Sequence, residues 1–562
     1  MKPRVWISEM GFSDGSKITI NKEDIVVLVG PNNSGKSASL KEANALLMNV
    51  TSPTKVVKGI TIDKEGTAED IIAHLDKISH KQHTSNPDPY YVGFGFHLYG
   101  GSIESQWNNN SNGLGDISKV FSKIVTTEER LTASNPANNI RITTEPPQHP
   151  IHFLQKDNTL ELKFSNYFKQ AFGLDLLIHR NAGSEVPLYI GNRASLPTGK
   201  DSSSMEYNVT LETMDRLNEQ GDGMRSFVGV LLNAFTSPHS ILFIDEPEAF
   251  LHPPQARLLG KMIASDLPAQ SQLFLSTHSE DFLQGLLESG APNLKIIRIQ
   301  REESINKVHV LDGADINTIW NDSLLRHSNI LNGLFHSQVV ICESDSDCRF
   351  FSSVLSVLSD EAEKPIPDIL FAHCGGKHRI PVAIKALKNL NVPIKVICDF
   401  DVLNDQNPLK EIFEDLGGKW NEVGSLWKTV KDAIESKRPE FLTVDAKAEI
   451  SRVLNSITDR IFPKNQVSVI NKILKKVSAW TEAKEVGKPY IPSGDATKAF
   501  EQLLTSLNSK GLILVEVGEL EGFVRSIGNH GPKWISEVLA TKDLLNDPEL
   551  DVARNFVKKH IH

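Results

Sequence analysis

The stretch IVVLVGPNNSGKSASLKEANALLM, residues 25–48, decides the fold of the N-terminal part of the chain. Its leading apolar run predicts a buried β-strand, and its last residues have the apolar spacing of a helix. Between them, residues 30–37 read G-x-x-x-x-G-K-S, the spacing of a phosphate-binding loop between a strand and a helix. Glycines let the backbone close around phosphate oxygens, and N–H groups at the helix N-terminus supply a positive field. The stretch therefore predicts an α/β fold with a nucleotide site.

Each polar residue of this loop has an expected role. The Lys36 ammonium should reach the β- and γ-phosphates of ATP, and the Ser37 hydroxyl should take a ligand position on Mg²⁺. Background residue frequencies give on the order of 0.02 chance matches in a chain of this length, which disfavours a glycine turn without a ligand. The residues expected to bind ATP here are Gly30, Asn32, Asn33, Ser34, Gly35, Lys36 and Ser37.

Two further strand-like runs end in polar residues. The run ILFI leads into Asp245 and Glu246. An Asp at a strand end can hold Mg²⁺ through water, and the adjacent Glu can polarise the attacking water. The run LFLSTHS puts His278 at the end of another strand. Asp245 is therefore expected among the ATP and metal ligands, and Glu246 and His278 among the catalytic residues.

A glycine-rich segment lies upstream of both runs. Residues 220–226 read QGDGMRS, and Gly221 and Gly223 can offer backbone N–H groups to phosphate. GPNNSGKS, QGDGMRS, ILFIDEPE and LSTHS in this order resemble the ABC/SMC-like class of ATPases. The resemblance implies ATP sandwiched in a dimer, with this segment as the signature loop acting in trans, Glu246 as general base and His278 as switch histidine. The segment departs from the common S-G-G-Q form of that loop.

About 180 residues separate the phosphate loop from the glycine-rich segment, more than a bare ATPase needs. No heptad repeat is visible there, so the long coiled coil of SMC proteins is not expected. QWNNNSNGLGD (residues 106–116) and NPANN have loop composition. The runs YVGFGFHLY, IRITTE (140–145) and LELKF (160–164) predict strands. A compact insertion or lid with β-rich structure fits this composition.

A second set of acids follows two apolar runs in the C-terminal part. The run QVVIC leads into Glu343 and Asp347, and the run KVIC leads into Asp399 and Asp401. Residues two apart on a strand point to the same side, so the last two carboxylates project together. If the strands are neighbours, all four acids converge at the carboxyl edge of a sheet, where open α/β sheets bind ligands. Such a cluster of hard oxygen ligands predicts bound Mg²⁺ or Mn²⁺.

These acids also have a recognisable order. E-S-x-x-D, then Gly-Gly-Lys377, then D-F-D resemble a Toprim domain, the Mg²⁺-dependent module of topoisomerases, primases and some nucleases. The resemblance implies that Glu343, Asp399 and Asp401 are catalytic. Ser344 stands where glycine usually follows the Glu. The alternative for any single acid is that it caps a helix or faces solvent.

The remaining C-terminal segments are helical and then strand-like. Residues 404–509 have helical patterns and read as an insertion before a last strand. That strand leads into Glu519 and Glu521, of which Glu521 is expected to be a further metal ligand, and Lys533 could support a transition-state charge.

Lysines gather in two places although the formal net charge of the chain is −10. Residues 369–398 contain basic residues and no acid, and three lysines repeat at i, i+3 and i+4 on one predicted helix. Such local basic surfaces predict nucleic-acid contact, with an ordinary solvated helix face as the alternative. The residues expected to contact nucleic acid are Lys377, Lys385, Lys388, Lys472, Lys475 and Lys476.

Composition narrows the class of protein. The chain has 562 residues, of which 40% are apolar and 23% charged, as in globular proteins. Its four cysteines form no C-x-x-C pair, which disfavours a zinc site or a disulfide framework. No apolar run approaches the length of a membrane helix, and the N-terminus lacks a signal-peptide pattern, so no membrane partner and a cytoplasmic location are expected.

An ATPase followed by a Toprim domain resembles the overcoming-lysogenization-defect (OLD) family of ATP-dependent endonucleases. The expected domains are an ABC/SMC-like P-loop ATPase at 1–325, a Toprim domain at 336–403 and 510–562, and a helical insertion at 404–509. The resemblance implies a homodimer or higher oligomer formed through the ATPase domain. It also implies ATP and Mg²⁺ as cofactors, cleavage of DNA by two-metal chemistry, and a role in anti-phage defence, with or without a partner protein.

Two other functions fit the same residues. One is a DNA-binding clamp or sensor that uses ATP as a switch and does not cleave. The other is the same metal chemistry directed at RNA such as tRNA, because a carboxylate–metal site does not discriminate between sugars. Cleavage of plasmid that depends on metal and on Asp399 separates the first from a nuclease.

Overall fold

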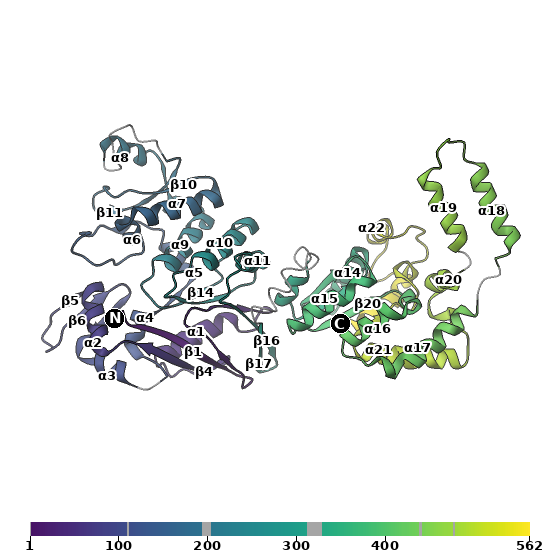
Figure 1. The fold of residues 1–562 in the computed structure, drawn as a ribbon, viewed down its shortest axis with the longest axis horizontal. Coiled ribbons are helices and arrows are strands. Elements are labelled where there is room, and N and C mark those ends of the chain that lie inside the picture. The colour runs from purple at the N-terminus through teal and green to yellow at the C-terminus, as the bar shows by residue number, and fades with distance from the viewer. Residues whose placement is uncertain are drawn as a thin grey trace. The chain divides into compact units, whose positions relative to one another are not determined.

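The computed structural model describes residues 2–109, 112–193, 204–311, 329–437, 441–475 and 478–561. The chain divides into two compact units, Met1–Asn321 and Asp322–His562 (Figure 1). Both units place parallel strands beside helices, so the predicted α/β fold class is confirmed. None of the described helices combines the length and the apolar composition needed to cross a membrane.

A six-stranded sheet forms the centre of the first unit. Five of its strands run parallel, and the antiparallel strand β17 pairs with β16 at one edge. Every residue of β3 and β15 is buried, as expected where both faces of a parallel sheet are covered. In sheet order the strands are β17 (Ile305–Leu311), β16 (Leu294–Glu302), β3 (Ile25–Val29), β15 (Gln272–Ser276), β14 (Ile241–Asp245) and β8 (Ser122–Val125).

Helix α1 (Lys36–Leu47) follows β3 and contacts both this sheet and strand β4 of a second sheet. Its residues Leu40 and Ala43 belong to a hydrophobic core shared by the two sheets. The carboxyl ends of β3, β14 and β15 therefore open at one edge, beside the start of α1. The second sheet is antiparallel, in the order β2 (Lys17–Thr19), β1 (Arg4–Phe12) and β4 (Val57–Glu65).

The region between the phosphate loop and the glycine-rich segment mixes small sheets with helices. The strands expected in YVGFGFHLY are present as β6 (Tyr90–Gly93) and β7 (Phe96–Tyr99), and β6 pairs with both β7 and β5 (Ser79–Gln82). A second small sheet contains β10 (Asp175–Ile178), β12 (Leu188–Gly191) and β13 (Asp215–Arg216).

Two strands predicted in this region are wrong. Residues 160–164 lie inside helix α7 (Asn158–Phe172), which is capped by Asp157 at its start and by Gly173 in the left-handed conformation at its end. Its buried residues recur at helical spacing, and the short LELKF window hides that period.

Residues 140–145 form a turn. The amide groups of Thr144 and Glu145 donate to the carbonyl oxygen of Arg141 at 3.1 and 2.8 Å. The Glu145 carboxylate accepts from the Arg141 amide at 2.9 Å. Local hydrogen bonds of this kind compete with strand pairing and outweigh the β-branched composition of IRITTE.

A four-stranded parallel sheet forms the centre of the second unit. Its order is β19 (Ile369–His373), β18 (Gln338–Cys342), β20 (Ile394–Cys398) and β21 (Leu512–Leu514). Strands β18 and β20 are direct neighbours, so the residues that follow both strands meet at one edge. The helices around the sheet include α14 (Asp345–Glu361), α15 (Ile380–Asn389), α22 (Pro532–Thr541) and α23 (Asp551–His560).

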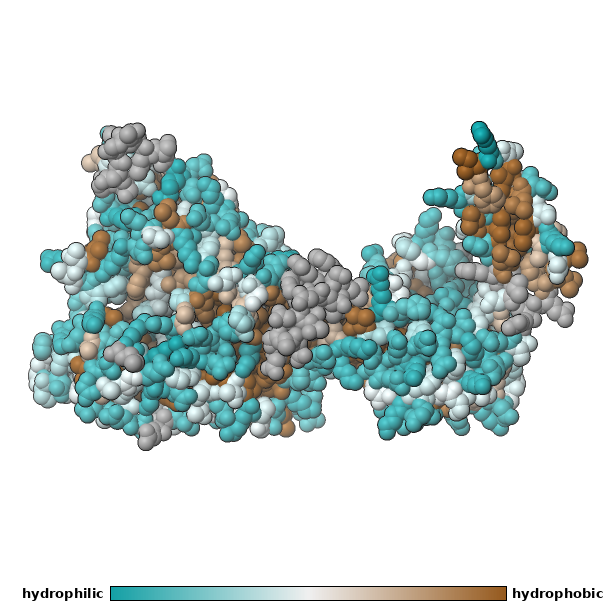
Figure 2. Space-filling view, in the orientation of Figure 1, coloured by the Kyte–Doolittle hydropathy of each residue, from teal (hydrophilic) through white to brown (hydrophobic). Residues whose placement is uncertain are grey.

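The chain between β20 and β21 is helical, as its sequence pattern predicts. Helices α18 and α19 pack on each other and carry apolar side chains that face solvent, which Figure 2 shows as brown surface along both helices. The helices are α16 (Gln406–Asp415), α17 (Trp420–Glu435), α18 (Thr443–Asn455), α19 (Lys464–Lys475), α20 (Ala479–Val486) and α21 (Asp495–Ser509).

Candidate active sites

The phosphate loop connects β3 to α1 and needs glycine at two positions. Gly30 has φ +143°, and a Cβ there would lie 2.1 Å from the Ile299 carbonyl oxygen. Gly35 has φ +100°, and its Cβ would lie 2.6 Å from Val56 Cγ2. Lys36 Nζ donates to the Gly30 carbonyl oxygen at 2.8 Å, across the loop. The backbone thus adopts the tight wrap that the sequence predicts.

A cavity of about 860 Å³ opens beside this loop. Glu246 and His278 line it together with the loop residues, although they come from other strands. Neither Gly221 nor Gly223 is among the described residues that line this cavity. The structure therefore brings together the predicted loop, base and histidine, and leaves the glycine-rich segment outside the cavity of its own chain. The loop residues that line the cavity are Asn32, Asn33, Ser34, Gly35, Lys36 and Ser37.

The two residues expected at the magnesium ion of ATP are in contact. Ser37 Oγ donates to Asp245 Oδ1 at 2.8 Å. Ser276, at the end of β15, donates to the same oxygen. This arrangement places a hydroxyl and a carboxylate at the mouth of the phosphate loop, as Mg²⁺ binding to a P-loop requires.

Glu246 and His278 form a pair beside the loop. His278 Nε2 lies 3.2 Å from Glu246 Oε1. Burial and the charge of Lys36 lower the pKa of His278, so the imidazole is neutral near pH 7. Glu246 has φ +47°, an unusual conformation for a residue other than glycine. A neutral imidazole beside a carboxylate can accept and orient a water molecule.

Arg130 holds the backbone that carries Glu246, and no sequence motif identifies this arginine. It lies in α5 (Thr127–Thr132) and is fully buried. Its Nη1 donates to the carbonyl oxygen of Asp245 at 3.0 Å and to that of Glu246. A fixed guanidinium on two consecutive carbonyl groups can maintain the left-handed turn at Glu246.

The glycine-rich segment contacts α5, the helix that contains Arg130. Helix α9 (Asp222–Thr236) begins after Gly221, and a Cβ at Gly223 would lie 2.8 Å from the Phe250 carbonyl oxygen. Arg225 Nη2 donates to the Leu131 carbonyl oxygen at 3.3 Å, one residue after Arg130. The start of α9 therefore contacts both α5 and the chain that follows Glu246.

Glu248 is a further acid near this site, and the sequence motifs assign no role to it. Its Oε1 accepts from Thr277 Oγ1 at 2.7 Å and from the His278 amide at 3.0 Å. The residue as a whole is partly exposed, but its Oε2 is buried and has no hydrogen-bond partner among the described residues. Burial of the carboxylate raises the pKa of Glu248 to about 7.

In the second unit, Glu343, Asp399 and Asp401 converge at the carboxyl ends of β18 and β20. One oxygen from each lies within 4.8 Å of the others. Glu343 Oε1 accepts from the Asp399 amide at 3.1 Å. Burial and the charge of Asp401 raise the pKa of Glu343 to about 7, and burial and Glu343 raise the pKa of Asp399 well above its usual range. Mutual repulsion of this kind is what a bound cation relieves.

Asp347 has a different local role from these three acids. It belongs to a capping box at the start of α14, where its Oδ2 accepts from the amide and the hydroxyl of Ser344, both at 2.8 Å. Ser344, which stands where glycine was expected, is the N-cap of this helix. The charge of Asp347 still contributes to the raised pKa values of Glu343 and Asp399.

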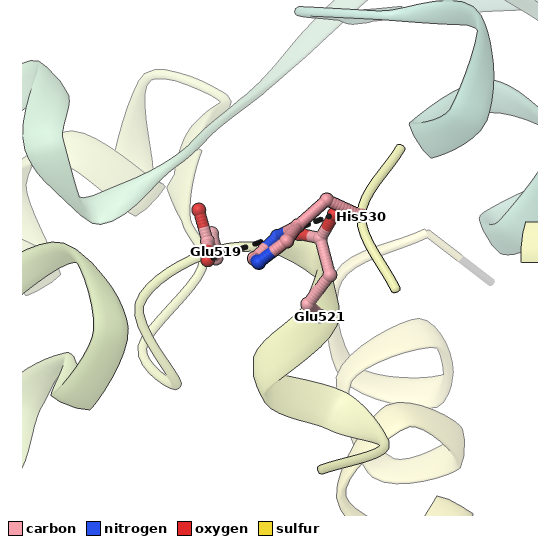
Figure 3. A group of neighbouring side chains, drawn as sticks. All are labelled: Glu519, Glu521 and His530. Atoms are coloured by element: carbon pink, nitrogen blue, oxygen red, sulfur yellow. Dashed lines mark ion pairs between the residues drawn. The ribbon is translucent and has the colours of Figure 1, made fainter. Parts of the chain in front are cut away.

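A second group of possible metal ligands contains Glu519, Glu521 and His530 (Figure 3). His530 Nδ1 lies 3.5 Å from Glu521 Oε1 and 3.9 Å from Glu519 Oε1. Glu521 Oε1 also accepts from the Gly531 amide at 2.7 Å. Glu521 therefore lies with Glu519 in this second group, and His530 was not expected from the sequence. Lys533 is exposed at the start of α22.

Lys484 of helix α20 lies between the two groups, and no motif pointed to it. Its Nζ is 3.1 Å from Asp399 Oδ2, 3.6 Å from Asp401 Oδ2 and 3.8 Å from Glu519 Oε2. Burial acts to lower the pKa of Lys484, but the charges of Asp399 and Asp401 outweigh it and hold this pKa above its ordinary value.

The lysines expected to bind nucleic acid have acidic neighbours where they are described. Lys377 Nζ lies 2.9 Å from Asp405 Oδ2. Lys385 Nζ lies 3.5 Å from Asp415 Oδ2, and Lys388 Nζ donates to the Asp415 carbonyl oxygen at 3.0 Å. The side chains of Lys472 and Lys475, and the whole of Lys476, lie outside the described residues.

Two family models match the chain. Residues 107–283 match "AAA domain, putative AbiEii toxin, Type IV TA system", and residues 334–401 match "Overcoming lysogenization defect protein-like, TOPRIM domain". The predicted combination of an ATPase domain with an OLD-like Toprim domain is therefore confirmed. No curated protein matches the chain.

Several solved structures of SMC head domains are similar to part of the chain. An SmcHead bound to the C-winged helix domain of ScpA is 14% identical, and the match covers 55% of this chain and 98% of that chain with a TM-score of 0.34. An Smc head domain with an extended coiled coil, bound to the C-terminal domain of ScpA and derived from Pyrococcus furiosus, is 12% identical, with 57% and 99% covered and a TM-score of 0.32. The SMC head domain from Thermotoga maritima is 11% identical, with 56% and 100% covered and a TM-score of 0.28.

Proposed function

We propose that this chain, in which an ATPase domain precedes an OLD-like Toprim domain, is an ATP-hydrolysing, divalent-metal-dependent endonuclease that nicks or cuts DNA. The observation that carries the proposal is the convergence of Glu343, Asp399 and Asp401. Carboxylate oxygens are the ligands that Mg²⁺ and Mn²⁺ prefer. Asp401 Oδ1 is buried and has no hydrogen-bond partner among the described residues, so it fits a metal ligand. The proposed domains are 1–325 for the ATPase, 336–403 and 510–562 for the Toprim domain, and 404–509 for its helical insertion.

In the ATPase half, the residues around the cavity have complementary roles. Ser37 and Asp245 would hold Mg²⁺, and Lys36 would bind the β- and γ-phosphates. Glu246 polarises the attacking water by accepting its proton, and His278, at 3.2 Å from Glu246, orients the same water. Arg130 fixes the carbonyl groups on either side of the turn, which keeps the Glu246 carboxylate directed at the cavity.

In the nuclease half, two sets of acids would hold the divalent cations. Glu343, Asp399 and Asp401 form one set, and Glu519 and Glu521 belong to the other. When bound, such cations supply an activated water and neutralise both oxygens of an in-line phosphodiester displacement. The Asp399 amide fixes the Glu343 carboxylate at 3.1 Å, and the Gly531 amide fixes Glu521 at 2.7 Å. Both contacts hold ligand oxygens in place without satisfying all of their lone pairs.

The partner and the biological role are parts of the same proposal. A homodimer formed through the ATPase domain is supported by the position of Gly221 and Gly223 outside the cavity of their own chain, because the resemblance to ABC/SMC-like ATPases assigns this segment to the site of a second copy. DNA as the substrate, and defence against phage with or without a partner protein, rest on the resemblance to OLD nucleases and on the match to the OLD-like Toprim model.

The experiment that tests this function incubates the purified chain with supercoiled plasmid, linear duplex DNA and tRNA. Each substrate is given Mg²⁺, Mn²⁺ or EDTA, with or without ATP. Metal-dependent nicking or cutting of DNA is the expected result. Cleavage of tRNA alone would redirect the same chemistry to RNA. ATP-dependent DNA binding without any cleavage would favour a clamp or sensor and contradict the nuclease.

A further inference from the structure

Lys484 joins the two groups of acids that the proposed nuclease would use. Its ammonium lies within 4 Å of Asp399 and Asp401 from the first group and of Glu519 from the second. The Lys484 side chain is 34% exposed, so it is not sealed off from solvent. The Lys484 ammonium therefore lies between the two sets of acids that would hold the metal ions, where it can attract a phosphate group.

The backbone that carries Lys484 is fixed against the strand-end loops. Gly518 has φ +109°, and a Cβ there would lie 2.1 Å from the Lys484 carbonyl oxygen. Gly487 has φ +75°, and its Cβ would lie 2.3 Å from the Glu516 carbonyl oxygen. The Lys488 amide donates to that same oxygen at 2.8 Å. Two glycines without side chains thus allow the end of α20 to approach the loop that leads into Glu519.

Helix α20 also packs on the short helix Phe400–Asn404, which contains Asp401. In addition, the Phe400 amide donates to the Gly518 carbonyl oxygen at 2.7 Å, so the two strand-end loops are bonded to each other. Lys484 is therefore held in place by three segments that contact one another: the end of α20, the loop that leads into Glu519, and the short helix that contains Asp401. Its ammonium can hold one position while a substrate enters.

The charges around the site favour such a group. Two divalent cations offset four of the six carboxylate charges here, before a phosphodiester adds its own. During hydrolysis the bond from phosphorus to the water oxygen forms and the ester P–O bond breaks. The water loses a proton to solvent and the leaving oxygen takes one up, while negative charge grows on the non-bridging oxygens. The six acids are Glu343, Asp347, Asp399, Asp401, Glu519 and Glu521.

We propose that Lys484 is a phosphate-binding catalytic residue, supplied by the helical segment between β20 and β21, that stabilises this charge on the scissile phosphate. The inference deepens the proposed nuclease function and rests on it. The ammonium acts as a fixed donor between the two metal positions and leaves metal binding to the acids. It makes the helical segment a part of the active site.

The test compares Lys484→Gln, Lys484→Arg and the control Lys488→Gln with the wild-type protein. Lys488 is four residues away and is paired with Glu501 and Glu516, outside both groups of acids. Isothermal titration with Mn²⁺ measures metal binding, plasmid nicking measures activity, and binding of a short DNA duplex in Ca²⁺ measures substrate affinity.

For Lys484→Gln we expect Mn²⁺ affinity within about threefold of wild type and a nicking rate lower by on the order of 100-fold. Duplex binding in Ca²⁺ should weaken. The slope of its affinity against salt concentration should fall by the amount expected for about one phosphate contact. Lys484→Arg should recover part of the nicking rate, and Lys488→Gln should match wild type in all three measurements.

Tighter Mn²⁺ binding with undiminished nicking in Lys484→Gln would overturn the inference, because the lysine would then only compete with metal. If the wild-type protein cleaves no substrate, the proposed function fails, and Lys484 is judged on duplex binding in Ca²⁺ alone. In that case, equal duplex affinity in Lys484→Gln and wild type would overturn the inference about Lys484.

Discussion

Ser37 and Asp245 are separated by 208 positions in the sequence, yet Ser37 Oγ donates to Asp245 Oδ1 at 2.8 Å. The contact exists because β3 and β14 both pair in parallel with β15, so their carboxyl ends open at the same edge. The first residues of α1 and the last residue of β14 thereby meet where the proposed function places Mg²⁺. This relationship is the structural basis for placing ATP hydrolysis in the first unit.

The first prediction separates ATP binding from ATP hydrolysis. Lys36→Ala should weaken nucleotide binding, because it removes the cation expected at the β- and γ-phosphates. Glu246→Gln should bind ATP with affinity close to wild type and hydrolyse it on the order of 100-fold more slowly, because the base acts only in the chemical step. Fluorescent-nucleotide titration and phosphate release measure the two effects. Unchanged turnover in Glu246→Gln would remove that residue from its role.

The second prediction concerns Arg130 as a positioning residue. Arg130→Gln should lower the turnover number for ATP by about tenfold or more while the KM for ATP stays near wild type, because the guanidinium holds the Glu246 turn and does not line the cavity. Arg130→Lys should recover part of the rate.

Arg257→Gln serves as the control for Arg130. It removes an arginine of the same unit whose guanidinium is paired with Glu288. An equal loss of turnover in Arg257→Gln would show that the effect is one of general stability. A rise in KM without a fall in turnover number for Arg130→Gln would show that the effect is one of binding.

The third prediction concerns the pH dependence of stability at Glu248. Its pKa is raised to about 7 in the folded chain by burial of the carboxylate. The folded state therefore binds a proton more tightly than the unfolded state, and this contribution to stability is present at low pH. This contribution is lost as the pH rises from the pKa of Glu248 in the unfolded chain, about 4.3, through its pKa in the folded chain, about 7.

Glu248→Gln removes that dependence because the amide cannot ionise. Urea denaturation measures the free energy of unfolding of both proteins. The variant's value minus the wild-type value should be about 1–2 kcal/mol higher at about pH 8 than at about pH 5. A constant difference between the two proteins across this range would mean that the Glu248 carboxylate is ionised in the folded chain.

The fourth prediction concerns three lysines, Lys472, Lys475 and Lys476. If Lys472, Lys475 and Lys476 contact phosphates, the affinity for duplex DNA should fall with salt by a slope of about −0.9 per contact. Replacing the three by Gln should flatten that slope to a similar degree for unrelated sequences. Lys385 and Lys388 approach Asp415 and should contribute less. A slope equal to wild type in the triple variant would mean that these lysines are only solvated.

The sequence is sufficient to predict the parts of both sites that lie at strand ends. Asp245, Glu343 and Asp399 each follow an apolar run, and the parallel order of the strands brings such ends to one edge. The strand predicted at 160–164 is wrong because a five-residue window cannot distinguish a helix face from a strand.

The residues that sequence reasoning missed come from helices beside the sheets. Arg130 and Lys484 lie in α5 and α20, and no local pattern marks either side chain. Their roles depend on tertiary approach, which the glycines at 229 and 518 permit: a Cβ at Gly229 would lie 1.9 Å from the Arg130 carbonyl oxygen. Contacts of this kind arise from packing between distant segments and have no signature at fixed spacing.

The central claim is that the carboxylates at β18 and β20 form a metal-dependent nuclease site that is separate from the ATPase. The measurement that tests it most directly follows plasmid cleavage and phosphate release in parallel for wild type, Asp399→Ala and the exposed control Asp360→Ala, each checked for folding by circular dichroism. Asp399→Ala should lose cleavage while ATP hydrolysis stays close to wild type, because removing a ligand lowers metal occupancy and misplaces the attacking water. Asp360→Ala should keep both activities. Cleavage retained in folded Asp399→Ala would contradict the claim, and the nuclease function would be withdrawn with it.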